Sequence, residues 1–479
     1  MNTGTVSFYQ STVKLHVKEA GKYQAFIVAS VQGEEDAAAD SRTSYRMIAD
    51  VLLDRRMEIV HERIFGSLSM EAAVLRERKA ALSERQISAA GPVTYVEGRP
   101  PWGDGLAGIT IHAVSQDSAD DVWTIMDGKD PCGRGWRRNG SKYLMLQNIT
   151  GAGLHPPLNP LPSPKVGALS KGWKREVPPP LAYDNNSTSS LTLKRDLEEM
   201  PPYSLRQAGL IDSPPVRGGD RGEGERGGYT DDSLKMSKAA QSRQMLDRAE
   251  RILRENNASY KDVARTWLYL SKILDWYPEF NKARSEKYGE FGIMPGPGDT
   301  TLLLPASTGI GADAPSGAAA SMDLLAVVKN DDLPSSVIKL SNRKQLDAFR
   351  YGAAFARGAV INEDDVSLIQ VSGTAAIDEH GVSLYPGDIR SQINCTFDKI
   401  DSLLRHEGAG LTDICAATVF VKRPEYAEVF WEMAKNRGLD EFPAVCVVAD
   451  VCREELLFEI DGEAIVKKGS EEAKDTWNA

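Results

Sequence analysis

The chain has 479 residues, of which 41% are hydrophobic and 26% charged, and its formal net charge at pH 7 is −11. This composition is typical of a soluble globular protein, and the length suits about three domains. The acidic balance argues against general nucleic-acid binding, which needs a dense positive surface. No apolar run approaches the roughly 18 residues of a membrane span, and the start lacks a signal-peptide pattern. We therefore expect a cytoplasmic protein that binds neither membrane nor nucleic acid.

The five cysteines and six histidines form no CxxC, HxxxH or HExxH motif. The sequence therefore has no frame for zinc or for disulfide exchange. We expect reduced, mostly buried thiols, no metal and no cofactor.

One unit recurs three times: a strand ending in a small polar turn, a helix, a second strand, a second helix and a final apolar strand. The opening and closing strands are predicted at residues 22–33 and 105–114, 142–151 and 320–328, and 367–374 and 456–466. The spacing is similar in all three once one insert is removed, which indicates tandem repeats. Because helices and strands segregate, each repeat is expected to be an α+β unit with helices on one face of a sheet.

The first repeat is assigned to residues 1–116. Helical periodicity is present in residues 40–54 and again in residues 70–86, with a β-rich run at 57–68 between them.

The second repeat, residues 117–330, is interrupted at about residues 152–228 by a segment that holds 12 of the chain's 25 prolines. Proline removes backbone donors and glycine raises the entropic cost of ordering, so little regular structure is expected there. Two interpretations stay open: a surface excursion, or an arm that covers a neighbouring repeat or subunit through Trp173, Leu181 and Tyr183.

After the insert, residues 233–256 and 277–293 are predicted helices on either side of a strand at 263–273. The third repeat, residues 331–468, copies this order before a polar tail at 469–479. Its helices are predicted at 388–410 and 424–438, around a strand at 414–422.

This order, together with the sequence of residues 387–430, resembles the Rid (YjgF-like) superfamily of trimeric imine deaminases and related proteins. The resemblance implies three Rid-like (chorismate-mutase-like) repeats that form an intramolecular pseudo-trimer. In Rid deaminases an arginine follows a Pro-Ala pair and binds the substrate carboxylate, and the last strand carries a glutamate. Here Val445 follows Pro443 and Ala444, and Glu459 matches the glutamate.

A narrower resemblance, over the second and third repeats, is to the chorismatases, which hydrolyse chorismate and release pyruvate. Five ordered blocks carry it: Ala264–Leu270, Asn342–Gly358, Gln370–Ile377, Pro386–Gln392 and Val451–Gly462. The first repeat would then fill the third position of the pseudo-trimer.

The chorismatase resemblance implies that Glu459 is the general acid/base, and its expected burial would raise its pKa toward neutrality. It also implies substrate-binding roles for five residues: Arg265, Tyr269, Arg357, Gln392 and Cys452. The two arginines would bind the two carboxylates of a chorismate-like molecule, because a guanidinium matches a carboxylate bidentately.

Structural alternatives stay open for these residues. Glu459 could be paired at a sheet edge, and Arg265 could form an ion pair with Asp262 or Asp275. Arg357 could face solvent, and Cys452 could be an inert buried thiol.

The leading hypothesis is a cofactor-independent, chorismatase-like hydrolase or lyase that acts on a small cyclic carboxylate or enol ether, between the second and third repeats. Gly108 and Ser321 align with Glu459 on the other closing strands, and neither can exchange protons, so we expect one active cleft. A metabolite-binding or scaffold protein of the same superfamily and a Rid-type imine deaminase are the alternatives. A homo-oligomer also stays open.

Overall fold

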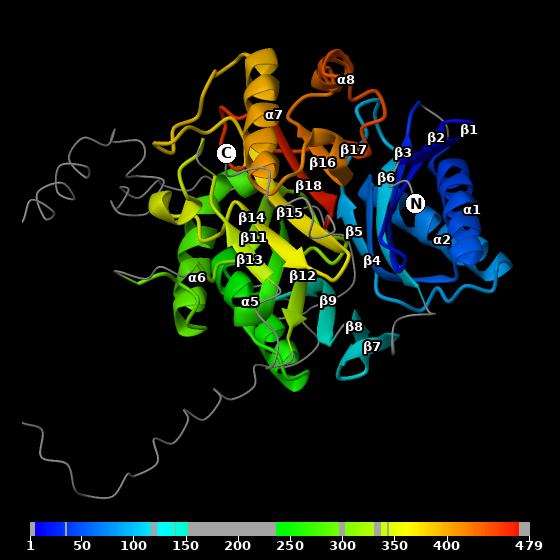
Figure 1. Ribbon diagram of the computed structural model, residues 1–479, viewed down its shortest axis with the longest axis horizontal. Helices are drawn as coiled ribbons and strands as arrows, with labels where there is room; N and C mark the ends of the chain where they lie inside the picture. The colour runs from blue at the N-terminus through cyan, green and yellow to red at the C-terminus, as the bar shows by residue number, and fades with distance from the viewer. Residues whose placement is uncertain are drawn as a thin grey trace, which may run out of the picture. The chain divides into compact units, whose positions relative to one another are not determined.

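The protein is described by a computed structural model over residues 5–33, 36–115, 122–138, 140–151, 236–296, 302–329, 337–342 and 344–468. The proline-rich insert and the polar tail predicted from the sequence lie outside these residues. The described chain forms three six-stranded sheets (Figure 1). Their strand order is the same, so three tandem α+β repeats are confirmed.

The first sheet has the order β1-β2-β3-β6-β4-β5, and two helices cover one of its faces. Its elements are β1 (Val6–Gln10), β2 (Val13–Ala20), β3 (Gln24–Val31), α1 (Ala37–Arg55), β4 (Met57–Gly66), α2 (Glu71–Glu84), β5 (Thr94–Glu97) and β6 (Leu106–Ser115).

The second sheet has the corresponding order β7-β8-β9-β12-β10-β11. Its elements are β7 (Val122–Asp127), β8 (Asp130–Arg138), β9 (Ser141–Thr150), α5 (Lys238–Glu255), β10 (Val263–Leu270), α6 (Tyr277–Glu290), β11 (Ala306–Gly311) and β12 (Ala320–Val328).

The third sheet repeats the order as β13-β14-β15-β18-β16-β17. Its elements are β13 (Val337–Leu340), β14 (Gly358–Asn362), β15 (Val366–Ala375), α7 (Ile389–His406), β16 (Ile414–Val421), α8 (Tyr426–Asn436), β17 (Ala444–Val448) and β18 (Phe458–Lys467).

Helix α7 shows how the sequence sets these elements. The side chain of Asp388 caps its start by accepting a hydrogen bond from the backbone of Ser391 at 3.1 Å. Ile393, Phe397 and Ile400 are buried at a spacing of three or four residues, so one face of the helix packs on the sheet.

The sequence prediction missed three strands in every repeat. Two strands precede each predicted opening strand, and a short strand pairs in parallel with the second predicted one. Strand β8 contains two glycines, a proline and three arginines, so it has too little apolar character to be recognised. The parallel strand β5 has only four residues, which is too short for a periodic pattern.

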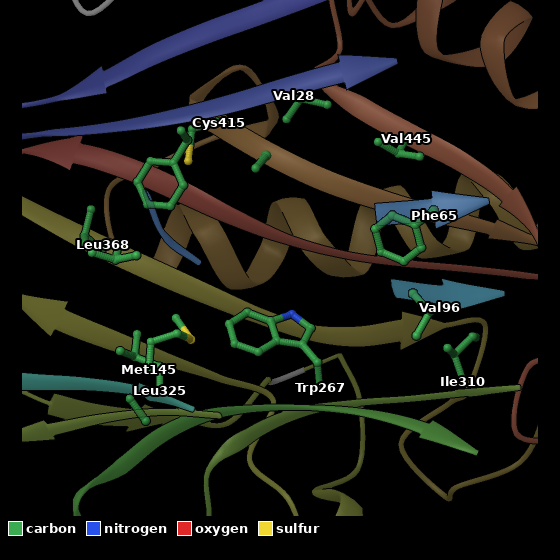
Figure 2. Packing of buried hydrophobic residues seen from close by; sticks show 14 of the residues in the cluster. Val28, Phe65, Val96, Met145, Trp267, Ile310, Leu325, Leu368, Cys415 and Val445 are labelled. Atoms are coloured by element: carbon green, nitrogen blue, oxygen red, sulfur yellow. The ribbon is translucent and has the colours of Figure 1, made fainter. Parts of the chain in front are cut away.

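Opposite its helices, each sheet contributes to one shared hydrophobic core. This core contains Phe65 of the first repeat, Trp267 and Leu325 of the second, and Leu368 and Val445 of the third. Figure 2 shows these side chains converging from different sheets. Burial of apolar area at about 25 cal/mol per Å² makes this joint core a main source of cohesion between the repeats.

Candidate active site

Glu459 lies on β18, between Ala375 of β15 and Phe420 of β16. Strand β15 is bulged between Val371 and Thr374, beside this position. Gly373 leaves the space that the carboxyl group occupies, because a Cβ at Gly373 would lie 2.1 Å from Glu459 Oε1. A side chain at position 373 would therefore displace the Glu459 carboxyl group from its place beside the bulge.

The carboxyl group of Glu459 is buried and unpaired. The residue is 5% exposed, and none of the described residues donates a hydrogen bond to its carboxyl group or forms an ion pair with it. Burial and the negative charge of Asp461 raise the pKa of Glu459 to about 8, against the opposing charges of Arg265 and Arg357. At neutral pH the group is therefore mostly protonated and able to donate a proton.

Arg265 crosses from the second repeat to the third. Its Nη2 lies 3.0 Å from Asp461 Oδ2 on β18, and it also donates to Thr308 Oγ1 at 2.5 Å. The ion pairs with Asp262 or Asp275 that the sequence left open are therefore not formed. Burial lowers the pKa of Arg265 to about 10, so the side chain stays a cation at neutral pH. Its Nε and Nη1 are buried without a partner.

Thr308 of β11 connects the same groups. Its hydroxyl donates to Asp461 Oδ2 at 2.8 Å and accepts from the backbone N–H of Gly373 at 3.1 Å. The second repeat thus supports both the bulge and the strand that hold Glu459.

Arg357 is 3% exposed and does not face solvent, which excludes that alternative. Its Nε donates to the carbonyl of Leu346 at 3.0 Å, and its Nη2 donates to the hydroxyl of Tyr351 at 2.8 Å. No carboxylate among the described residues lies within ion-pair distance of it. Its positive charge lowers the pKa of Glu459, so the two side chains are within electrostatic range.

Cys452 lies close enough to Glu459 for the two groups to affect each other's ionisation. Burial, together with the charge of Glu459, raises the pKa of the Cys452 thiol to about 12, so the thiol is neutral. It packs as a partly buried side chain at the edges of two hydrophobic cores.

Gln392 makes its hydrogen bonds to the backbone. Its amide donates to the carbonyls of Tyr385 and Glu455 at 3.1 and 2.9 Å, and its oxygen accepts from the N–H of Leu457 at 2.8 Å. This arrangement holds the segment that enters β18, with both amide hydrogens in use.

Tyr269 is buried on β10 next to Arg63; burial raises the pKa of its hydroxyl, and the charge and side-chain hydrogen bond of Arg63 oppose that rise. Its cross-strand neighbour on β12 is Ser321. The structure therefore brings Glu459, Arg265, Arg357 and Cys452 into one neighbourhood, whereas Tyr269 lies beside the position in the second repeat that matches Glu459.

Residues 351–466 match the family model described as Endoribonuclease L-PSP, the Rid family. The predicted resemblance of the third repeat to the Rid superfamily is therefore confirmed. The chain is also 28% identical over 226 residues to a chorismatase of Streptomyces hygroscopicus, an alignment that covers 42% of this chain and 61% of that protein. A 3-hydroxybenzoate synthase of the same organism is 26% identical over 230 residues, covering 42% of this chain and 63% of that protein.

A crystal structure of a chorismatase superposes with a TM-score of 0.49 at 17% identity, covering 85% of this chain and 93% of that one. In sequence, the chain spans about three fifths of the length of the curated relatives that it matches.

Val445 stands where Rid deaminases carry the carboxylate-binding arginine, but it packs on β6 of the first repeat. The matching position of the second repeat is Thr308, since Thr308 pairs with Trp267 as Val445 pairs with Thr418. Thr308 lies beside Gly373 and not on the first repeat. At the Glu459 site, the position that corresponds to the Rid arginine is therefore occupied by Thr308. Like Val445, this residue cannot bind a carboxylate as an arginine would.

The strand registers confirm the alignment of the three closing strands. Glu459 pairs with Phe420, Ser321 with Tyr269 and Gly108 with Phe65, each at the same place in its sheet. Among the described residues, only the third repeat has an acid at this position.

The sequence prediction missed Thr308 and Asp461. Their hydrogen bond joins residues 153 positions apart, so no local pattern could have signalled it. Within the described ranges, no three His, Cys, Asp or Glu side chains gather as a metal site requires. No helix described by the structure is long and apolar enough to cross a membrane.

Proposed function

We propose that the chain is an enzyme that hydrolyses the enol ether of a chorismate-like cyclic carboxylate, with Glu459 as general acid and without a cofactor. The observation that carries this proposal is the buried, unpaired carboxyl group of Glu459, with a pKa of about 8, beside the cations Arg265 and Arg357. Relatives named chorismatase and 3-hydroxybenzoate synthase support the substrate class.

The reaction begins with transfer of the Glu459 proton to the terminal CH₂ of the enol ether. The π electrons form the new C–H bond, and positive charge develops on the carbon bonded to the ether oxygen. Water adds to that carbon and returns a proton to Glu459. In the hemiketal, the bond between the hemiketal carbon and the former ether oxygen then breaks. This oxygen, which stays on the ring, takes the proton of the hemiketal hydroxyl group, so that pyruvate and a ring alcohol leave. One water is consumed and the glutamate is regenerated.

Arginines near the acid would hold the carboxylates of such a substrate. Arg357 has no acidic partner among the described residues, and Arg265 has two buried nitrogens without partners. Hydrogen bonds from these groups to a carboxylate would be strengthened by their burial. In this proposal Cys452 shapes the site beside Glu459, and Tyr269, within electrostatic range of Arg265 and Asp461, borders it. Gln392 keeps the segment leading to β18 in place.

A Rid-type imine deaminase has less support. Val445 follows Pro443 and Ala444, and Ser307 follows Pro305 and Ala306, while Thr308 has the register position of Val445. None of the three is the arginine of those enzymes. The elevated pKa of Glu459 instead suits a reaction that starts by donating a proton.

Release of pyruvate from chorismate, followed with a lactate dehydrogenase-coupled assay, tests the proposal. We expect turnover by the wild-type protein and a loss of about 100-fold or more in Glu459→Gln, which keeps the shape but cannot donate a proton. Glu454→Gln is the matched control, because this exposed glutamate only pairs with Lys422 at the surface.

Turnover undiminished in Glu459→Gln would contradict the assignment of the acid. Binding of chorismate without any turnover by the wild-type protein would favour the metabolite-binding alternative.

A further inference from the structure

Arg284 of α6 is a buried cation without a counter-ion. The residue is 1% exposed, its Nη2 donates to Asn281 Oδ1 at 2.7 Å, and its Nε has no partner. No carboxylate in the described parts of the chain is within ion-pair distance of it. A buried charge in this state is costly, so its presence calls for a reason.

The other buried arginines show how unusual this is. Six arginines are buried among the described residues: Arg63, Arg78, Arg138, Arg265, Arg284 and Arg357. The first four have a carboxylate oxygen within 4.0 Å. In the described chain, only Arg284 and Arg357 have no carboxylate oxygen within this distance. The first belongs to the second repeat and the other to the third.

The two unpaired arginines share one aromatic ring. The guanidinium carbon of Arg357 lies 5.2 Å from the ring centre of Phe355, and that of Arg284 lies 5.7 Å from the same centre. The ring offsets part of the cost of burying each charge. Two cations on one ring without an anion nevertheless repel each other, so the pair has the charge of a site for an anionic ligand.

Tyr277, near the start of α6, connects this pair with the acid. Burial raises the pKa of the Tyr277 hydroxyl, the charges of Cys452 and Glu459 raise it further, and the nearby guanidinium of Arg284 lowers it. The groups therefore lie within electrostatic range of one another. Helix α6 of the second repeat thus reaches the same neighbourhood as Glu459 of the third.

We propose that Arg284 and Arg357, both next to the ring of Phe355, form the carboxylate-binding pair of the site, and that Arg284 is a substrate-binding residue for a dicarboxylate. Arg265 already pairs with Asp461, a carboxylate that it shares with Arg63, so in this account Arg265 positions that strand and contributes only its free N–H groups. This inference rests on the function proposed above and assigns the second carboxylate of the substrate to Arg284 in place of Arg265.

The test uses two unreactive ligands that differ by one carboxylate, 3-(carboxymethoxy)benzoate and 3-methoxybenzoate, with binding measured by calorimetry. The wild-type protein should prefer the dicarboxylate by about 30-fold or more, and Arg284→Met should reduce this preference to about threefold. Arg284→Lys, which keeps the charge but loses the planar fork, should fall between them. Lys282→Met is the matched control, because it removes one charge from an exposed position of the same helix and should leave the preference unchanged.

Thermal unfolding without ligand separates binding from a structural role. Removal of an unpaired buried charge should leave the melting temperature of Arg284→Met equal to or above that of the wild-type protein. A lower melting temperature with the preference intact would overturn the inference and leave the proposed function standing. If Arg284→Met does not fold, Arg284→Lys binding with wild-type preference overturns it. A wild-type protein that binds neither ligand nor chorismate would overturn the proposed function and this inference together.

Discussion

Glu363 and Glu459 are equally buried glutamates with opposite surroundings. Glu363, which follows β14, is 4% exposed and Glu459 is 5% exposed. The carboxylate of Glu363 accepts hydrogen bonds from Gln24 at 2.7 and 2.8 Å and from Tyr143 at 3.0 Å, and it forms an ion pair with Arg138 at 2.9 Å. Glu459 has none of these partners among the described residues.

The difference separates a structural acid from a candidate catalyst. Burial raises the pKa of both groups, but Arg138, Tyr143 and Gln24 oppose the rise at Glu363. Glu363 also joins side chains from all three repeats, so its hydrogen bonds hold the repeats together. Burial alone therefore does not mark an active-site acid. An active-site acid is instead marked by a buried carboxyl group that lacks hydrogen-bond partners and lies near an unpaired cation.

The largest expected effect is on stability at Glu363. Glu363→Gln leaves the buried Arg138 without its main counter-charge, and we expect the free energy of unfolding to fall by about 3–5 kcal/mol. Turnover per folded molecule should stay within about threefold of wild type, because Glu363 has no contact with the candidate site. Denaturant titration together with the pyruvate assay checks both. If Glu363→Gln kept its stability but lost turnover, Glu363 would be a catalytic and not a structural residue.

A smaller effect of opposite sign is expected at Glu459. Between its ordinary pKa of 4.5 and about 8, the folded protein holds a proton that the unfolded chain has released, so wild-type stability falls as pH rises through this window. Glu459→Gln does not titrate and should be more stable than wild type by about 1–3 kcal/mol at pH 8, and by much less at pH 5. Denaturation at both pH values checks this. An equal difference at the two pH values would show that Glu459 has an ordinary pKa.

Gly373→Ala should have the smallest effect. The new methyl group would meet the Glu459 carboxyl group at 2.1 Å and displace it, which we expect to lower kcat by about tenfold. Gly410→Ala is the matched control, because a Cβ there meets nothing within 4 Å and its φ of −141° suits any residue. An alanine at 373 without kinetic effect would mean that the carboxyl position is not critical.

The fold was predictable wherever a strand is continuously apolar or a helix has one apolar face. The closing strand of the second repeat was predicted at residues 320–328 and is observed as Ala320–Val328. Strand β2 was missed, although its apolar residues alternate with Lys14, His16 and Lys18. These polar side chains are buried against other parts of the fold. The sequence of β2 alone cannot indicate this burial.

The site was predictable only in part. Glu459, Arg265 and Arg357 followed from resemblance, but the pairing of Arg265 with Asp461 joins residues 196 positions apart. Arg284 carried no signal, because the buried face of α6 also includes Asn281 and Lys287, so the sequence shows no apolar stripe that would separate this face from the surface. What distinguishes it is the absence of an acidic partner within the described fold, and this is a property of packing rather than of sequence.

The pH dependence of kcat/KM tests the central claim, that Glu459 enters the reaction as a buried, protonated acid. The measurement reports the ionisation of the free enzyme, and a required acid loses activity as it deprotonates. With the pKa of Glu459 raised to about 8, kcat/KM for chorismate should be level near neutral pH and fall about tenfold per pH unit above about 8. A profile that stays level well above pH 8, or that rises with a pKa near the ordinary glutamate value, would contradict the account.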